Sequence, residues 1–170
     1  MRINDFKSVL LSKNCDFALF YNSDQRVSPN LFYFSGYKGT GALVVPAGKP
    51  PFLAVPEMEF EKAKKSTSNG FFGIYKMEKK KFFESVYRNV REKRLKAKII
   101  AIDKNNFTLN SYRYFKKQFK SAKVRDISES CLELRQTKTE KETTFLKKSC
   151  GYADKILQKA ISVFGSFKTE

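Results

Sequence analysis

Residues 30–65 read NLFYFSGYKGTGALVVPAGKPPFLAVPEMEFEKAKK, and this stretch decides the fold of the chain. It predicts, in order, an aromatic turn, a glycine corner, a strand, a proline–glycine turn, a second strand and a charged helix. The strands at 41–45 and 52–55 flank the turn PAGKPP, which favours an antiparallel hairpin with a long connection. We do not expect a phosphate-binding loop at the glycine corner, because a strand rather than a helix follows it.

Outside this stretch, helical and strand patterns alternate along the chain. Expected helices cover residues 3–12, 57–65, 79–95, 108–119, 127–134 and 139–164, and further expected strands cover 16–21, 71–75, 98–102 and 122–125. The run DFALFY at 16–21 is nearly all apolar, as expected of a strand covered on both faces. The alternation predicts an α/β fold, a three-layer mixed sheet of about six strands with helices on both faces.

Two finer expectations concern single side chains. In the helix expected over 108–119, the spacing predicts that Leu109, Tyr112, Phe115 and Phe119 face inward. The three cysteines at 15, 131 and 150 are odd in number and widely spaced, which argues against a zinc site or a redox motif. We expect them to be small buried thiols.

Composition narrows the chemistry. The chain has 170 residues, enough for one good core, and it contains no histidine. The lack of histidine excludes Ser-His-Asp and Cys-His catalysis and histidine-bound metals within this sequence. No run approaches the roughly 18 uncharged apolar residues of a membrane span, and the N-terminus lacks the pattern of a signal peptide. We therefore expect a cytoplasmic protein that does not cross a membrane.

The positive charge is unevenly distributed. Of the net charge of +17, residues 76–125 carry +13, from 17 basic and 4 acidic side chains. This block favours either an acidic or nucleic-acid partner or a solvated lysine-rich face. Because 26 of the 34 basic residues are lysines and no known nucleic-acid motif is present, we expect non-specific nucleic-acid binding at most.

A nuclease would need clustered carboxylates at strand ends. The candidates Asp16, Asp24, Asp103 and Asp126 are scattered in the sequence, with no DxD-type spacing. Asp103 directly follows the expected strand 98–102, but a single aspartate there is usually a turn residue. We therefore do not expect nuclease activity.

Five residues of the opening stretch form a motif: Asn30, Tyr33, Ser35, Gly36 and Tyr37. The segment resembles the NxxYxTGF-type signature of the N-terminal domain of the creatinase/prolidase family, the metal-dependent Xaa-Pro peptidases. Ser35 stands where that family often has Thr, and Tyr37 stands where it often has Phe.

A second motif lies at 134–157, where LRQTKTEKETTFLKKSCGYADKIL resembles the family pattern LRxxKSPEEIxxIRxAxxIAD. The matching positions are Leu134, Arg135, Lys138, Thr139, Glu142, Ala153 and Asp154. Glu140 replaces the usual Pro, and Thr143 stands where an aliphatic residue is common. With the strand NCDFALFY and the unit beginning KIIAIDKNNF, the resemblance covers nearly the whole chain.

The resemblance implies a ribonuclease-H-like N-terminal domain over residues 1–135. It also implies a linking helix over 136–170 that leads into an absent C-terminal catalytic domain. In the family that domain holds two divalent metal ions, such as Mn²⁺ or Co²⁺, and we expect all their ligands to lie beyond residue 170. The resemblance thus implies no catalytic, cofactor or metal residue here, although the parent would be an Xaa-Pro dipeptidase or aminopeptidase. The N-terminal domain would help form a homodimer and restrict access to the active site.

A second hypothesis stays open, namely a free-standing peptidase-like binding module for an acidic or nucleic-acid partner. Clustering of the charge of residues 76–125 on one face would favour it.

The helix expected over 139–164 has an apolar stripe that needs a partner surface. Its apolar stripe comprises Leu146, Cys150, Ala153, Leu157, Ala160 and Phe164. This stripe must fold back, self-associate or remain exposed, and we predict a homodimer or a crystal contact through it.

Overall fold

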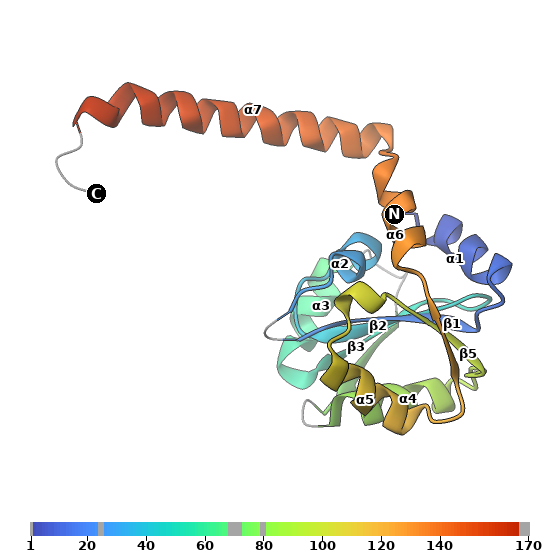
Figure 1. Cartoon of the computed structure of the whole chain (residues 1–170). Helices are drawn as coiled ribbons and strands as arrows, with labels where there is room; N and C mark the ends of the chain where they lie inside the picture. The colour runs from blue at the N-terminus through green and yellow to red at the C-terminus, as the bar shows by residue number, and fades with distance from the viewer. Residues whose placement is uncertain (1, 24–25, 68–72, 79–80, 167–170) are drawn as a thin grey trace. The chain divides into compact units, whose positions relative to one another are not determined.

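The computed structural model describes residues 2–166 except 24–25, 68–72 and 79–80 (Figure 1). The chain divides into two compact units, Met1–Leu134 and Arg135–Glu170. The first unit contains the sheet and the helices that cover it, and the second contains one long helix.

The first unit is built on a six-stranded sheet with the order β4-β3-β2-β1-β5-β6. Its strands are β1 Phe17–Asn22, β2 Gly41–Pro46, β3 Phe52–Pro56, β4 Gly73–Met77, β5 Ile99–Ile102 and β6 Lys123–Asp126. β2 runs antiparallel to both of its neighbours, β1 and β3, whereas the other neighbouring strands are parallel. The predicted mixed sheet of six strands is confirmed, and the predicted hairpin is β2–β3.

β1 lies at the centre and is buried along its whole length, as predicted from its apolar sequence. Its side chains alternate between the two faces, because successive residues of a strand point in opposite directions. Phe17, Leu19 and Tyr21 belong to one buried cluster, and Ala18 and Phe20 belong to the other. The sheet therefore separates two cores.

Helices cover both faces. The core that contains Phe20 receives residues from α1 Ile3–Ser12, α2 Pro29–Ser35, α3 Phe60–Ser66 and α6 Ser128–Gln136. The core that contains Phe17 receives residues from α4 Phe82–Glu92 and α5 Leu109–Gln118. Figure 1 shows α4 and α5 together on the face of the sheet opposite α1 and α2. The predicted three layers are confirmed.

α4 and α5 pack through aromatic side chains. Phe83 of α4 meets Phe115 of α5 edge to face, with ring centroids 6.1 Å apart, and Tyr87 of α4 meets Phe119 in the same way at 5.2 Å. Phe83, Val86 and Val90 are buried at helical spacing along α4. The Thr108 hydroxyl accepts a hydrogen bond from the backbone N–H of Ser111 and caps α5. The prediction for Leu109 is wrong, because this residue is 69% exposed. It is the first residue of α5, and the buried face of the helix begins one turn later.

Several bounds differ from those predicted. The helix expected over 57–65 begins as a 3₁₀ turn, η1 Glu57–Glu59, and continues as α3. β4 begins at Gly73, and residues 71–72 of the strand expected there lie outside the described residues. The helix expected over 79–95 is shorter, because α4 ends at Glu92. Cys15 and Cys131 are buried as expected, but the expectation is wrong for Cys150, which lies on an exposed part of a helix.

The second unit contains α7 Glu140–Val163, followed by the 3₁₀ turn η4 Phe164–Ser166. None of the 24 residues of α7 is buried. Its exposed apolar side chains are Phe145, Leu146, Tyr152, Ile156, Leu157 and Ile161. Within the described ranges, no helix is both long enough and apolar enough to cross a membrane.

Candidate functional site

The first signature motif lies in and just after α2. The Ser28 hydroxyl accepts a hydrogen bond from the Leu31 backbone N–H and Pro29 occupies the first turn, so the residues before the motif start the helix. Gly36 ends it with a positive φ of 75°, a conformation that favours glycine. Within this short helix Asn30 and Ser35 are buried polar residues, and each therefore needs hydrogen-bond partners.

Asn30 finds its partner at the carboxyl end of β5. Its side-chain Nδ2 donates to Oδ2 of Asp103, with 2.5 Å between the two atoms. Asp103 is only 3% exposed. Nδ2 of Asn106, in the 3₁₀ turn η3 Lys104–Asn106, also donates to Oδ2, and the Ser128 hydroxyl donates to Oδ1 at 2.9 Å. Three donors from separate segments thus surround one buried carboxylate, which compensates for its removal from water.

Asp126, at the carboxyl end of the neighbouring strand β6, belongs to the same cluster. The Ser128 hydroxyl lies 2.6 Å from Oδ1 of Asp126, so its single proton is shared between Asp126 and Asp103. Oδ1 of Asp126 also accepts from the backbone N–H groups of Ser128 and Lys104. Partial burial raises the pKa of Asp126, but these hydrogen bonds outweigh burial and lower its pKa below the ordinary value of 3.8.

The structure corrects the picture of scattered carboxylates. Asp103 and Asp126 meet around Ser128, because β5 and β6 are parallel neighbours and end at the same edge. Asp16 lies at the opposite edge, where its Oδ2 accepts from the backbone N–H groups of Lys98 and Ile99 at the start of β5. Asp24 lies outside the described residues. The two carboxylates that meet are occupied by donors from the protein itself, so the cluster joins α2, β5, β6 and α6.

Ser35 and Tyr37 fix the glycine corner. The Ser35 hydroxyl donates to the Leu31 carbonyl at 2.6 Å and accepts from the Tyr37 backbone N–H at 3.1 Å. The buried Tyr37 hydroxyl lies 2.9 Å from Oε2 of Glu59 and 3.0 Å from the Thr40 carbonyl. Burial, followed by the hydrogen bond to Glu59 and its negative charge, raises the pKa of Tyr37.

Gly39 explains why the corner needs glycine. A Cβ placed on Gly39 would come within 2.3 Å of both the Tyr37 hydroxyl and Oε2 of Glu59. Any larger residue would therefore displace the Tyr37–Glu59 contact. Glu59 was not among the predicted signature residues, and nothing in its sequence spacing from Tyr37 indicates the pairing.

Tyr33 connects the two signature motifs within the first unit. Its hydroxyl lies 3.5 Å from the carbonyl of Leu134, a long contact. The same carbonyl accepts a shorter hydrogen bond, of 2.9 Å, from the Arg2 guanidinium. The beginning of the unit, its first motif and its last residue therefore meet at one point.

The remaining signature residues belong to the second unit. The Thr139 hydroxyl accepts from the Glu142 backbone N–H at 3.2 Å, and Oε2 of Glu142 accepts from the Thr139 backbone N–H at 2.8 Å. These two bonds form a capping box, a pattern typical of Thr and Glu three residues apart, and it begins α7. Nζ of Lys138 donates to the Gln136 carbonyl at 2.9 Å. Arg135 is half-buried in α6.

The described residues do not form a binding site for the metal ions that the resemblance implies. Over residues 2–166, apart from the gaps at 24–25, 68–72 and 79–80, no three His, Cys, Asp or Glu side chains are placed to hold a metal ion together. We therefore derive no metal-dependent step from these residues.

The class of the protein follows from its fold. It is a three-layer α/β domain, in which helices cover both faces of a six-stranded mixed sheet and a hydrogen-bonded signature motif joins α2 to the sheet. The family model for the creatinase/prolidase N-terminal domain matches residues 2–137, and the chain belongs to this family. An uncharacterized peptidase of Staphylococcus epidermidis is 29% identical over 163 residues, which cover 92% of this chain and 42% of that protein. The Xaa-Pro dipeptidase of Pyrococcus furiosus is 26% identical, over 83% of this chain and 38% of that protein.

Solved structures show the same fold. The X-Pro aminopeptidase from Thermotoga maritima superposes with a TM-score of 0.78 at 19% identity, over 88% of this chain and 41% of that one. The chain thus spans about two fifths of the length of the relatives that it matches.

Proposed function

We propose that this chain is the non-catalytic N-terminal domain of a metal-dependent Xaa-Pro dipeptidase or aminopeptidase. It would help form the dimer and restrict access to an active site carried by a C-terminal domain. The observation that carries the proposal is the family match over residues 2–137, together with relatives that are more than twice as long. The two divalent metal ions, such as Mn²⁺ or Co²⁺, would be bound outside the residues described above.

The second unit supports this proposal through its exposed apolar side chains. Ile156, Leu157 and Ile161 are each more than 60% exposed on α7. Burial of one such side chain is worth about 1.5–3 kcal/mol, so a helix that leaves several in water is suited to packing against a further surface. We propose that a C-terminal domain or a second copy of the chain covers this stripe.

The direct test is hydrolysis of an Xaa-Pro dipeptide with added Mn²⁺ or Co²⁺. We would assay this chain alone and the same chain joined to whatever coding sequence follows it in its gene. Activity in the extended protein only is the expected result. Inactivity of both, or the lack of any catalytic domain to join, would overturn the peptidase proposal and favour the free-standing binding module.

A second assay addresses the restriction of access. Deleting residues 1–135 from the extended protein should raise the hydrolysis of long Xaa-Pro peptides relative to Xaa-Pro dipeptides. An unchanged ratio in a folded, active deletion variant would refute the role in access.

Sedimentation at high protein concentration tests the dimer, since a strictly monomeric extended protein would contradict that part of the proposal.

A further inference from the structure

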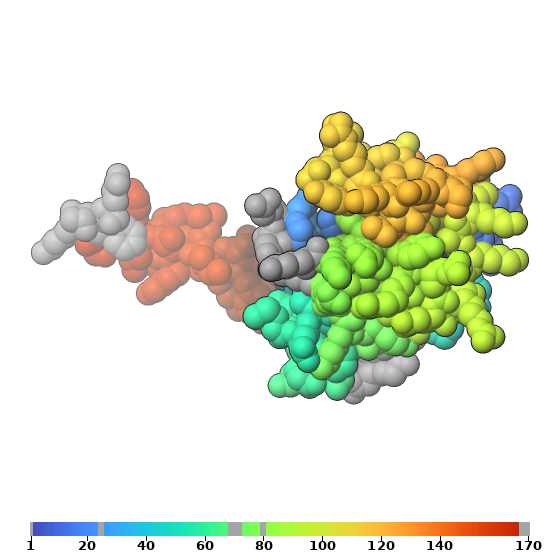
Figure 2. Space-filling view, turned by 90° about the horizontal axis from the view of Figure 1, so that it is seen from below, coloured from blue at the N-terminus to red at the C-terminus, as the bar shows by residue number. Residues whose placement is uncertain are grey.

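The excess positive charge of residues 76–125 gathers in part around one hollow on the α4–α5 face. This hollow, of about 590 Å³, lies beside the last turns of α4 and α5 and the segment between α4 and β5. Five basic side chains line it: Arg91, Lys96, Lys98, Lys117 and Lys120. No carboxylate lines it. Figure 2 shows this face, with α4 in green to yellow-green beside α5 in yellow to orange.

These five cations are available to a ligand. All five are exposed, and none forms an ion pair with a carboxylate in the described ranges. The carboxyl ends of α4 and α5 lie nearby, and each helix end carries a partial charge of about −0.5. Five full positive charges outweigh these two partial charges, so the hollow attracts anions.

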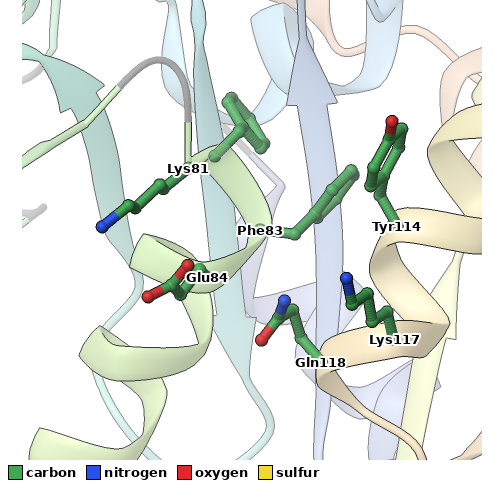
Figure 3. A pocket seen from close by; sticks show the side chains of 7 residues that line it. Lys81, Phe83, Glu84, Tyr114, Lys117 and Gln118 are labelled. Carbon is green, nitrogen blue, oxygen red and sulfur yellow. The ribbon is translucent and has the colours of Figure 1, made fainter.

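A second hollow, of about 400 Å³, continues the first one along the two helices. The two hollows share Lys117 and Gln118, so they form one groove. Figure 3 shows Phe83 of α4 and Lys117 and Gln118 of α5 reaching into the second hollow, with Tyr114 at its edge. Tyr114 is 58% exposed, which leaves much of its side chain accessible. We call the two hollows together the α4–α5 groove.

From this arrangement we infer that the α4–α5 groove binds single-stranded nucleic acid without sequence preference. The two hollows together are lined by six cations, the five named above and Lys81, against one carboxylate, Glu84. This excess of cations suits the phosphates of a flexible strand, and an exposed aromatic ring offers a surface on which a base can stack. Five of the six cations are lysines, which contact phosphates as point charges rather than reading base edges. An acidic protein segment would use the cations but not the aromatic ring. This binding goes beyond the proposed peptidase role and does not depend on it.

The test is fluorescence anisotropy with labelled dT20 and rU20 oligonucleotides at several salt concentrations between 50 and 200 mM. The groove variant carries Arg91→Gln, Lys96→Gln, Lys98→Gln, Lys117→Gln and Lys120→Gln. The matched control carries Lys141→Gln, Lys147→Gln, Lys148→Gln, Lys155→Gln and Lys159→Gln, all on α7. Each variant loses five charges, from +17 to +12, so only the position of the lost charge differs.

We expect the groove variant to bind about tenfold or more weakly, with a salt slope shallower by about 2, and the control to change less than about threefold. Equal weakening of both variants would overturn the proposal, because the attraction would then come from net charge alone. Failure of both oligonucleotides to bind would overturn it as well. Circular dichroism of both variants verifies that each is folded.

Two further comparisons test the class of ligand. Tyr114→Ala should weaken dT20 binding by about fivefold, whereas Tyr152→Ala on α7, also exposed, should not. A poly-glutamate peptide of matched length that binds as tightly as dT20 would show that the groove recognises charge only, and would refute the nucleic-acid proposal.

Ultraviolet cross-linking tests the location of the site. Cross-linking of the unaltered protein to dT20 should label peptides of α4 or α5. Labelling confined to α7 would contradict the groove as the site.

Discussion

Four of the seven residues of α2 are buried, whereas none of the 24 residues of α7 is. A seven-residue helix is too short to be stable alone, so α2 depends on its packing and on hydrogen bonds such as Asn30–Asp103. α7 has length and a complete capping box, which are local sources of stability. The signature motifs therefore serve different ends, one joining distant segments and the other starting a helix. Four substitutions would break or sharpen this contrast.

The largest effect is expected at the buried carboxylate. Asp103→Ala removes the acceptor that Asn30 and Asn106 share and one of the two acceptors of the Ser128 hydroxyl, and we expect the free energy of unfolding to fall by about 3 kcal/mol. Urea denaturation followed by tyrosine fluorescence measures this change. Asp154→Ala on the exposed face of α7 is the control and should change stability little. A loss below about 1 kcal/mol for Asp103→Ala would contradict the role assigned to the cluster.

The next effect is expected at the end of α2. Gly36→Ala puts a side chain on a backbone with φ of 75° and a Cβ 3.0 Å from the Ser66 carbonyl. We expect a loss of about 1–2 kcal/mol, measured by thermal unfolding. Gly48→Ala is the matched control, since no atom beyond its own residue and its two chain neighbours lies within 4 Å of its Cβ position. Equal melting temperatures for the two variants would show that the corner can adjust.

A smaller effect, confined to the second unit, is expected at the capping box. Thr139→Ala should cost about 1 kcal/mol of helix stability and speed hydrogen exchange in the first turn of α7. Denaturation of the first unit should not change. Thr144→Ala, within α7, is the comparison, because its hydroxyl donates only to the Glu140 carbonyl of its own helix. If Thr139→Ala also lowered the stability of the first unit, the contrast between the two helices would be wrong.

The smallest effect depends on pH. Because the folded-state pKa of Asp126 lies below its ordinary value of 3.8, its contribution to stability is present above that value. The contribution is lost as the pH falls through the lowered pKa. Urea midpoints measured from pH 7 down to pH 2 should therefore fall less steeply in Asp126→Asn than in the unaltered protein. Glu129→Gln, on the exposed surface of α6, should keep the original pH dependence, and identical curves for all three proteins would refute the assignment.

The sequence predicts local features well in this chain. The apolar run of β1, the capping box of α7 and the hairpin β2–β3 each depend on residues close together in the chain, and each was predictable. The Asn30–Asp103 bond joins residues 73 positions apart and requires the order and direction of the strands, which spacing does not reveal. The signal in the sequence is an aspartate directly after a buried strand, a position that is more typical of a turn residue.

The location of the charged surface is also not predictable from the sequence alone. The excess of basic residues in 76–125 is visible in the sequence, but which of them share a surface depends on how α4 packs beside α5. Lys117 and Arg91 lie 26 positions apart and line one hollow. The exposure of Leu109 is a related case, since helical spacing does not reveal that the buried face of α5 begins one turn after its first residue.

The hydrogen bond from Arg2 to the Leu134 carbonyl has a consequence for the order in which the protein can be made. α1 is translated first, yet it shares a core with Ile127 and Cys131, which are translated more than 100 residues later. The first unit therefore cannot close during synthesis until its last helix has emerged. Because its two ends meet, a circularly permuted version, with residues 2 and 134 joined by a short linker and new ends at the β2–β3 turn, should retain the same core.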